Sequence, residues 1–216
     1  MDSNGILFAE GKAAVPDGFI DFGLPSGTLW STKNIGATNG NTAESWYGNY
    51  YAWGEIETKE IYDWDNYKYA NGNYDKLTKY CNDSTYGNNG FTDDLTQLVP
   101  EDDVATVTNS AWRMPTKEDF EELIAGTTNS WVTDYKGISG LNGRLFTGNN
   151  GNSLFIPAAG YCSGSDIYDV GSYCDLWSSS LFLGNPFDAY NLDFFSDDVS
   201  MSNYVRCGGL SVRPIC

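Results

Sequence analysis

Residues 115–126 have the sequence PTKEDFEELIAG, the strongest helix signal in the chain. Thr116 is a suitable N-cap, and the acidic side chains that follow it interact favourably with the helix dipole. Gly126 can end the helix. Three apolar residues recur on one face, as in a helix that covers a core: Phe120, Leu123 and Ile124. The pattern predicts a helix over residues 116–125.

A shorter helix is predicted over residues 100–108. Pro100 suits the first helical position, and Val104 and Val107 would face inward. Residues 101–103 are all acidic and complement the helix dipole. We interpret them as structural residues rather than as metal ligands.

The composition changes downstream of these two helices. Residues 137–216 contain no Lys, Glu or Gln, which are good helix formers. This part of the chain should therefore consist of strands and loops, and the whole chain should have an α+β fold. Alternation of apolar and polar residues places the expected strands at 19–24, 28–35, 50–53, 130–135, 144–146, 153–156, 175–180, 189–194, 199–206 and 210–214.

The charge of the chain excludes several classes of function. Its 216 residues include 12 Lys and Arg against 29 Asp and Glu, a net charge of −17, and no His. Without imidazole there is no Ser-His-Asp or Cys-His hydrolase site and no histidine metal ligand. Nucleic acid and anionic membranes attract proteins through clustered Lys and Arg. We therefore expect no nucleic acid as a partner and no direct membrane insertion.

A tract of Tyr, Asn, Asp and Gly with little periodicity spans about 57–98. A stretch of this length in a compact domain is either a functional insertion or a packed loop stabilised by its own aromatic side chains. Residues 1–17 form an N-terminal extension, and one domain is expected over 18–216. Residues 1–8 do not resemble a signal peptide, so a leader was either removed or never used.

The remaining chemical signals are weak. The five cysteines show no CxxC pair and no zinc spacing; they are either free thiols or include a bridge between Cys162 and Cys174. Residues 63–66, Asp-Trp-Asp-Asn, form the most calcium-like segment but lack EF-hand spacing. We expect no cofactor, with a structural Ca²⁺ as the open alternative. No P-loop, GxSxG elbow or dinucleotide fingerprint is present, and no enzymatic activity is expected.

Six short sequence motifs, most of them containing aromatic residues, follow one another along the chain. They are GLPSGTLW (23–30), YAWGE (51–55), WRMPT (112–116), FIPAAGY (155–161), WSSS (177–180) and SVRP (211–214). In this order they closely resemble the Fibrobacter succinogenes major paralogous domain family, which is common in Bacteroidetes. That family belongs with the formylglycine-generating-enzyme branch of C-type-lectin-like folds. The resemblance covers the chain from about residue 18 to its end.

The resemblance implies a C-type-lectin-like fold, with two helices, small antiparallel sheets and long irregular loops that carry the ligand surface. The resemblance does not imply that this chain has the oxidase activity of the formylglycine-generating enzymes. That activity depends on a cysteine pair in the C-terminal part, and Cys162, Cys174 and Cys207 do not stand in a matching motif.

The tryptophan and arginine residues of these motifs are expected to belong to the scaffold. Aromatic side chains in apolar strand motifs fill cores, and a buried indole N–H binds a carbonyl oxygen. This applies to Trp30, Trp53, Trp112 and Trp177. Arg113 and Arg213 lie in apolar runs of an acidic chain, so each is predicted to pair with a carboxylate.

The last forty residues also resemble the variable region of proteins diversified by retroelements. In such proteins, adenine-directed mutagenesis of Asn codons rewrites a ligand-binding surface. Randomised AAY codons never yield Lys, Glu, Gln, Trp or Met, and between Leu181 and Leu210 only Met201 belongs to that set. Met201 would then be a scaffold position. The resemblance thus places a variable ligand-binding segment at 181–210.

Strand alternation should place Leu192 and Phe194 inward and Asp193 and Phe195 outward. Exposed aromatic side chains beside small polar groups give large contact areas with adaptable hydrogen bonds, as in antibody paratopes. The expected ligand-binding residues are Phe182, Leu183, Phe187, Asp188, Tyr190, Asp193, Phe195, Asp198, Ser200, Ser202, Tyr204, Val205, Cys207 and Leu210. The alternative is that these aromatic residues belong to the core.

We therefore expect a non-catalytic receptor-recognition domain that binds a protein or glycan on a cell surface. The protein itself would be located on a cell surface or a virion. The competing hypothesis is a structural or adhesive module of a bacterial surface or phage assembly without a diversified site. A formylglycine-generating-enzyme-like enzyme is the remaining alternative.

Overall fold

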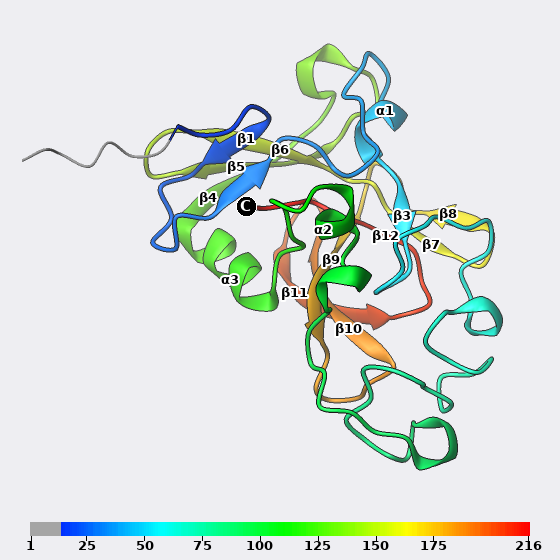
Figure 1. Cartoon of the computed structure of the whole chain (residues 1–216). Helices are drawn as coiled ribbons and strands as arrows, with labels where there is room; N and C mark the ends of the chain where they lie inside the picture. The colour runs from blue at the N-terminus through cyan, green and yellow to red at the C-terminus, as the bar shows by residue number, and fades with distance from the viewer. Residues whose placement is uncertain (1–13) are drawn as a thin grey trace, which may run out of the picture.

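A computed structural model describes residues 14–216, and within them the chain folds as a mixed α+β protein of small sheets and few helices (Figure 1). The α-helices are α1 (Glu44–Tyr47), α2 (Val104–Thr108) and α3 (Lys117–Gly126). Short 3₁₀ helices lie at Trp64–Asn66, Asn88–Gly90, Pro100–Asp102 and Tyr135–Gly137. The expected N-terminal extension falls mostly in residues 1–13, outside the described residues.

The central sheet has five strands in the order β11-β10-β9-β12-β3. Its strands are β3 (Tyr50–Tyr51), β9 (Cys174–Leu181), β10 (Asp188–Phe194), β11 (Val199–Val205) and β12 (Leu210–Ser211). All neighbours are antiparallel except β12 and β9. The strand-rich C-terminal third that the composition predicted is confirmed.

Three smaller antiparallel sheets complete the fold. A three-stranded sheet contains β4 (Thr127–Val132), β5 (Gly143–Gly148) and β6 (Ser153–Pro157), and two-stranded sheets pair β1 (Phe19–Asp21) with β2 (Leu29–Ser31) and β7 (Tyr161–Ser163) with β8 (Asp166–Tyr168). Residue Cys216 exchanges two backbone hydrogen bonds with Leu29, so the C terminus lies against β2.

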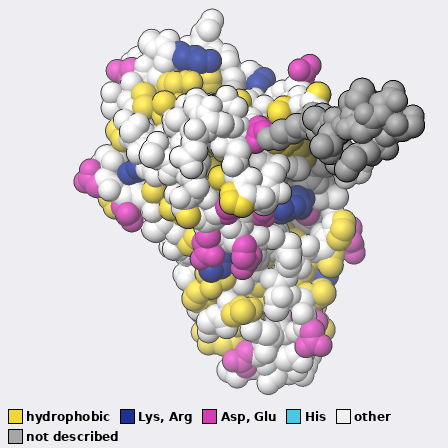
Figure 2. All heavy atoms as spheres, turned by 90° about the vertical axis from the view of Figure 1, so that its left-hand side faces the viewer, with side chains coloured by type: hydrophobic (Ala, Val, Ile, Leu, Met, Phe, Trp, Pro, Cys, Tyr) yellow, Lys and Arg dark blue, Asp and Glu magenta, His cyan; other side chains and the backbone are white. Residues whose placement is uncertain are grey.

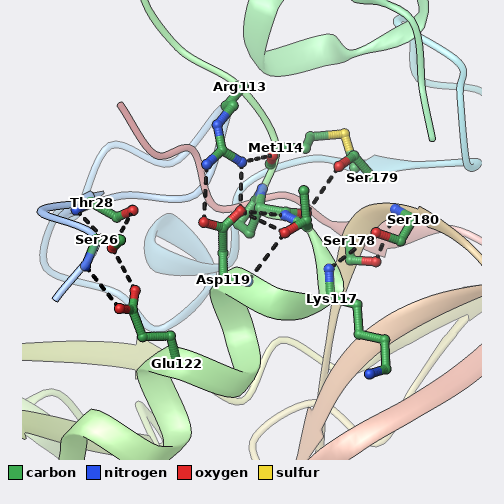
Figure 3. A network of polar contacts seen from close by, with 12 residues as sticks. Ser26, Thr28, Arg113, Met114, Lys117, Asp119, Glu122, Ser178, Ser179 and Ser180 are labelled. Carbon is green, nitrogen blue, oxygen red and sulfur yellow. Dashed lines mark hydrogen bonds and ion pairs between the residues drawn. The ribbon is translucent and has the colours of Figure 1, made fainter. Parts of the chain in front are cut away.

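The beginning of α3 is fixed by a polar network (Figure 3). Thr116 is the N-cap as predicted, and its hydroxyl and backbone N–H both bond to Asp119 in a capping box. Arg113 donates to both carboxylate oxygens of Asp119, at 2.5 and 3.0 Å, which confirms its predicted pairing. The backbone N–H of Lys117 donates to the Ser180 hydroxyl and ties the helix to β9.

The helix predicted over 100–108 is divided into a 3₁₀ turn and α2. Asp103 is the N-cap of α2, because its carboxylate accepts from the backbone N–H groups of Ala105 and Thr106. The prediction that Val104 and Val107 both face inward is half wrong. Val104 is buried, but Val107 is 50% exposed because a helix of five residues buries only one face.

The tryptophan residues are mostly core residues, as expected. Trp53 donates to the carbonyl of Ser178 and Trp177 to that of Tyr51. Trp30 is fully buried, yet its indole nitrogen has no hydrogen-bond partner among residues 14–216, so the predicted carbonyl contact is wrong there. Trp112 is only half-buried and packs against the edge of the core.

The 57–98 tract is a packed loop that its own aromatic side chains hold against the core, and it runs below β3 and β10 in Figure 1. The carboxylate of Asp102 accepts hydrogen bonds from Lys79 at 2.6 Å and from the Tyr80 hydroxyl at 2.7 Å. Burial alone would raise the pKa of Asp102, but the hydrogen bonds from Lys79 and Tyr80 and the charge of Lys68 hold it below its usual value. The tract is therefore anchored at a buried ionic centre.

Some elements were not anticipated from the sequence. Helix α1 and the β7–β8 hairpin were not predicted, and the strand expected at 130–135 occupies Thr127–Val132 instead. Asp134 ends it with a left-handed backbone (φ 50°). No helix among residues 14–216 is long and apolar enough to cross a membrane.

Candidate functional site

The register of β10 and β11 creates one polar face on the central sheet. Asn191 lies opposite Ser202, Asp193 opposite Ser200, and Ala189 opposite Tyr204, so these side chains share one side of the sheet. The alternate residues Leu192 and Phe194 are fully buried towards α3, as predicted. We call the side that carries Asp193, Ser200, Ser202 and Tyr204 the strand face.

A pair of carboxyl groups lies at the centre of the strand face. Asp193 accepts hydrogen bonds from the Tyr173 hydroxyl at 2.7 Å and from the Ser200 hydroxyl at 2.9 Å. Asp175, its cross-strand neighbour on β9, is 3% exposed and bonded by the Asn191 amide. Burial first, and the charge of Asp193 second, raise the pKa of Asp175 to about 8. Asp175 is therefore mostly neutral at pH 7, and Asp193 supplies accessible hydrogen-bond acceptors.

A row of aromatic rings runs along the edge of the strand face. Tyr168 stacks on Tyr161 at 5.5 Å between centroids, Tyr161 meets Tyr173 at 6.5 Å, and Tyr173 stacks on Phe195 at 6.3 Å. Tyr204 joins the row through Tyr161. The two ends are open to solvent, since Tyr168 is 43% and Phe195 39% exposed. Burial raises the pKa of Tyr204 to about 12, so its phenol remains neutral.

Residues 137–216 present no exposed basic side chain. They contain three arginines, Arg144, Arg206 and Arg213, and all three are buried. Arg144 donates to the backbone carbonyls of Phe195 and Ser196 and thereby fixes the turn that exposes Phe195. On the α3 side of the molecule, seen in Figure 2, carboxylates are spread over the surface, and lysine and arginine show only in a few separate places. The strand face on the other side of the sheet is an aromatic surface with oxygen acceptors, and residues 137–216 add no exposed basic side chain to it.

A second concave surface lies where the 57–98 tract meets the β9–β10 turn. Half-buried or exposed side chains line a hollow of about 370 Å³: Trp64, Tyr74, Tyr86, Phe187 and Val205. We call it the junction hollow. Phe187 contacts Tyr74 at 5.4 Å and Tyr86 at 5.1 Å between ring centroids.

The predicted binding residues do not form one patch. The strand face and its rim contain Asp193, Phe195, Ser200, Ser202 and Tyr204. Phe187 and Val205 line the junction hollow, and Leu183 lies exposed beside it. Phe182 and Tyr190 contact each other, and Lys117 of α3 lies over the Tyr190 ring. The register places Tyr190 on the side of the sheet opposite to Asp193.

Four further predicted residues lie outside the strand face. Asp198 is exposed in the β10–β11 turn, and Asp188 is half-buried at the start of β10, where burial raises its pKa. Cys207 and Leu210 are buried in the core, at 5% and 0% exposure, so their assignment to a ligand surface is wrong. The chain turns inward there to place β12 between β9 and β3.

Sequence reasoning missed Tyr161, Tyr173 and Asp175, which supply the aromatic row and the second carboxyl group. They precede the predicted segment and approach it only through the β9–β10 pairing and the β7–β8 hairpin. Tyr161 ends the FIPAAGY motif (155–161), which is the sequence signal that could have pointed to it. The prediction that Arg213 pairs with a carboxylate is also wrong, since it donates to the Ser31 carbonyl.

Arg206 was also missed, although it joins distant segments. Its guanidinium is fully buried and donates to the carbonyls of Lys79, Tyr80 and Pro186 and to the Tyr67 hydroxyl. Its backbone N–H donates to the Phe187 carbonyl at 3.0 Å. Arg206 therefore fixes the 57–98 tract and the β9–β10 turn relative to each other.

The thiols are free and not activated, and the calcium-like segment has a structural role. All five cysteines are free, so Cys162 and Cys174 are not bridged. Burial raises the pKa of Cys162 to about 11 and that of Cys207 to about 12, which suppresses their thiolates. In the 63–66 segment, the Asp63 carboxylate caps the 3₁₀ turn. Among residues 14–216, no three His, Cys, Asp or Glu side chains are placed to hold a metal ion.

Comparison of the chain with protein-family models, with curated proteins and with solved structures yields no match.

Proposed function

We propose that this protein is a non-catalytic recognition domain whose strand face binds a protein or glycan on a cell surface. One observation carries the proposal: a row of partly exposed aromatic rings lies beside the hydrogen-bonded carboxylate of Asp193, and residues 137–216, which supply both, present no exposed basic side chain. Aromatic anchors with polar neighbours are typical of binding surfaces, and a rigid hydrogen-bond network lowers the entropic cost of binding.

A C-type-lectin-like fold and a retroelement-diversified segment are part of this proposal. The few helices, the small antiparallel sheets and the long loops support the fold. Ser200, Ser202 and Tyr204, which adenine-randomised AAY codons can yield, alternate on the strand face, while Met201 packs towards α3 on the other side. Such an arrangement would let side chains on the strand face vary while the core contacts of β11 remain.

The binding test uses exposed positions, because their replacement leaves the core intact. The protein is applied to glycan arrays and to intact bacterial cells, alongside the double variant Phe195→Ser/Tyr168→Ser. Val107→Ser is the matched control, since Val107 is 50% exposed on the distant α2. We expect saturable binding that falls at least tenfold in the double variant and is unchanged in the control. Binding that is absent, or equal in all three proteins, contradicts the proposal.

Diversification is tested separately at the gene. A reverse transcriptase gene and a near-repeat of the 181–210 coding segment that differs at adenines would support it. If neither is present but binding holds, the protein is an adhesive module without a diversified site.

A further inference from the structure

The junction hollow is built from two segments far apart in the sequence. Three of its aromatic rings come from the 57–98 tract, and Phe187 and Val205 come from the β9–β10 turn and β11. The rings of Tyr74, Tyr86 and Phe187 contact one another at interplanar angles of 48° to 70°. They form a continuous aromatic wall, and Tyr74 at its mouth is 45% exposed.

A polar hollow adjoins this aromatic one. It has a volume of about 490 Å³ and is lined by Asn82, Asp83, Ser84, Thr92, Leu183, Gly184, Asn185 and Pro186. The two hollows lie side by side, because the consecutive residues Pro186 and Phe187 line one each. The Oδ1 atom of Asn185 is buried and has no hydrogen-bond partner among the described residues. Such an acceptor is unfavourable unless a ligand or water donates to it.

The charges around the hollows favour a neutral ligand. No charged side chain lines the aromatic hollow, and Asp83 is the one charged residue that lines the polar hollow. This carboxylate and the net charge of −17 repel anions. At the aromatic hollow a cation is disfavoured as well, since the buried Arg206 donates to the Pro186 carbonyl at 2.7 Å. The remaining ligand class has an apolar face for the rings and neutral hydroxyls for the polar hollow.

We propose that the junction hollow and the adjoining polar hollow together bind a neutral oligosaccharide, independently of the strand face. One sugar ring stacks on the wall formed by Tyr74, Tyr86 and Phe187. The next ring extends over the polar hollow, where its hydroxyls bond to Ser84, Asn82 and the free oxygen of Asn185. Because Arg206 holds both walls through backbone contacts, the site is preorganised in the unliganded protein.

The site is tested with a panel of neutral gluco-, xylo- and manno-hexasaccharides, with oligogalacturonate and chitosan oligomers as the anionic and cationic counterparts. Binding is measured by isothermal calorimetry and by the change in tryptophan fluorescence, to which Trp64 contributes. We expect at least one neutral hexasaccharide to bind with a Kd below about 1 mM and the charged oligomers to bind at least tenfold more weakly. If no neutral sugar binds, or if a charged oligomer binds more tightly, the proposal is wrong.

Paired variants separate this site from the strand face. Tyr74→Ser should weaken saccharide binding at least tenfold, because an exposed ring is removed without opening the core. Ser84→Ala should weaken it about threefold through loss of one hydrogen bond. Phe195→Ser on the strand face should leave saccharide binding unchanged. Equal binding by Tyr74→Ser and the unmodified protein would overturn the assignment, whatever the strand face binds.

Discussion

The strand face and the junction hollow differ in how they are built. The strand face consists mainly of alternate residues of two neighbouring strands, and it is acidic and hydrogen-bonded. The junction hollow is uncharged and depends on a loop tract that packs against a turn about a hundred residues later in the sequence. Local periodicity can therefore indicate the first surface, whereas the second exists only because long-range contacts hold its walls together.

Replacement of Arg206 should have the largest effect on stability, and it should disturb the junction hollow rather than the strand face. Arg206→Met removes the donor for three buried carbonyls and the Tyr67 hydroxyl. We expect a loss of about 3–5 kcal/mol in the free energy of unfolding, because the carbonyls lose their partners. Denaturant unfolding of the variant measures the loss.

Arg144→Met is the matched control, since Arg144 is also buried but fixes only the strand-face turn and the Asn129 side chain. At temperatures where both variants are folded, Arg206→Met should disturb the NMR signals of Tyr74 and Tyr86, and Arg144→Met those of Phe195. A change in unfolding free energy below about 1 kcal/mol for Arg206→Met would show that the junction does not depend on this side chain.

Leu210 is a core residue and Phe195 a surface residue, although both lie within the predicted ligand-binding segment 181–210. Leu210→Ala should cost about 2–5 kcal/mol of stability, because Leu210 is fully buried. Phe195→Ser should cost less than about 1 kcal/mol, because the ring is 39% exposed and stacks only on Tyr173. Thermal and denaturant unfolding check both values. Similar losses in the two variants would place Phe195 in the core and remove it from the binding surface.

Asp175 should make the stability of the strand face depend on pH. Its folded pKa, raised from 3.8 to about 8, means that the folded state holds a proton which the unfolded state releases between these values. Stability should therefore fall as pH rises from about 4 to 8, by up to about 1 kcal/mol per unit.

Asp175→Asn removes this titration and should flatten the pH dependence of the unfolding free energy. Asp193→Asn is the control, since it removes the neighbouring charge that contributes to the raised pKa of Asp175 and should reduce the slope only in part. An unchanged slope in Asp175→Asn would mean that another group titrates in this window.

Much of the scaffold could be predicted from the sequence. Capping chemistry identified Thr116, and composition identified the strand-rich C-terminal third, because both depend on local propensities. Alternation correctly placed Leu192 and Phe194 inside and Asp193 and Phe195 outside. The assignment of Leu210 to the ligand surface failed, because its polar neighbours in the sequence suggested a surface turn whereas β12 is a buried strand of two residues.

The sequence by itself determined the α+β composition, the helix start at Thr116, the alternation of β10 and the exclusion of histidine chemistry. These follow from single residues and short patterns, since backbone preferences and strand pleating act over a few positions. Only the tertiary structure decided that Tyr161 and Tyr173 join Asp193, that Arg206 binds the 57–98 tract, and that Phe187 meets Tyr74 and Tyr86. Those contacts join residues up to about 140 positions apart. They depend on burial and on the satisfaction of hydrogen bonds in the whole folded chain, so the local periodicity of the sequence does not indicate them.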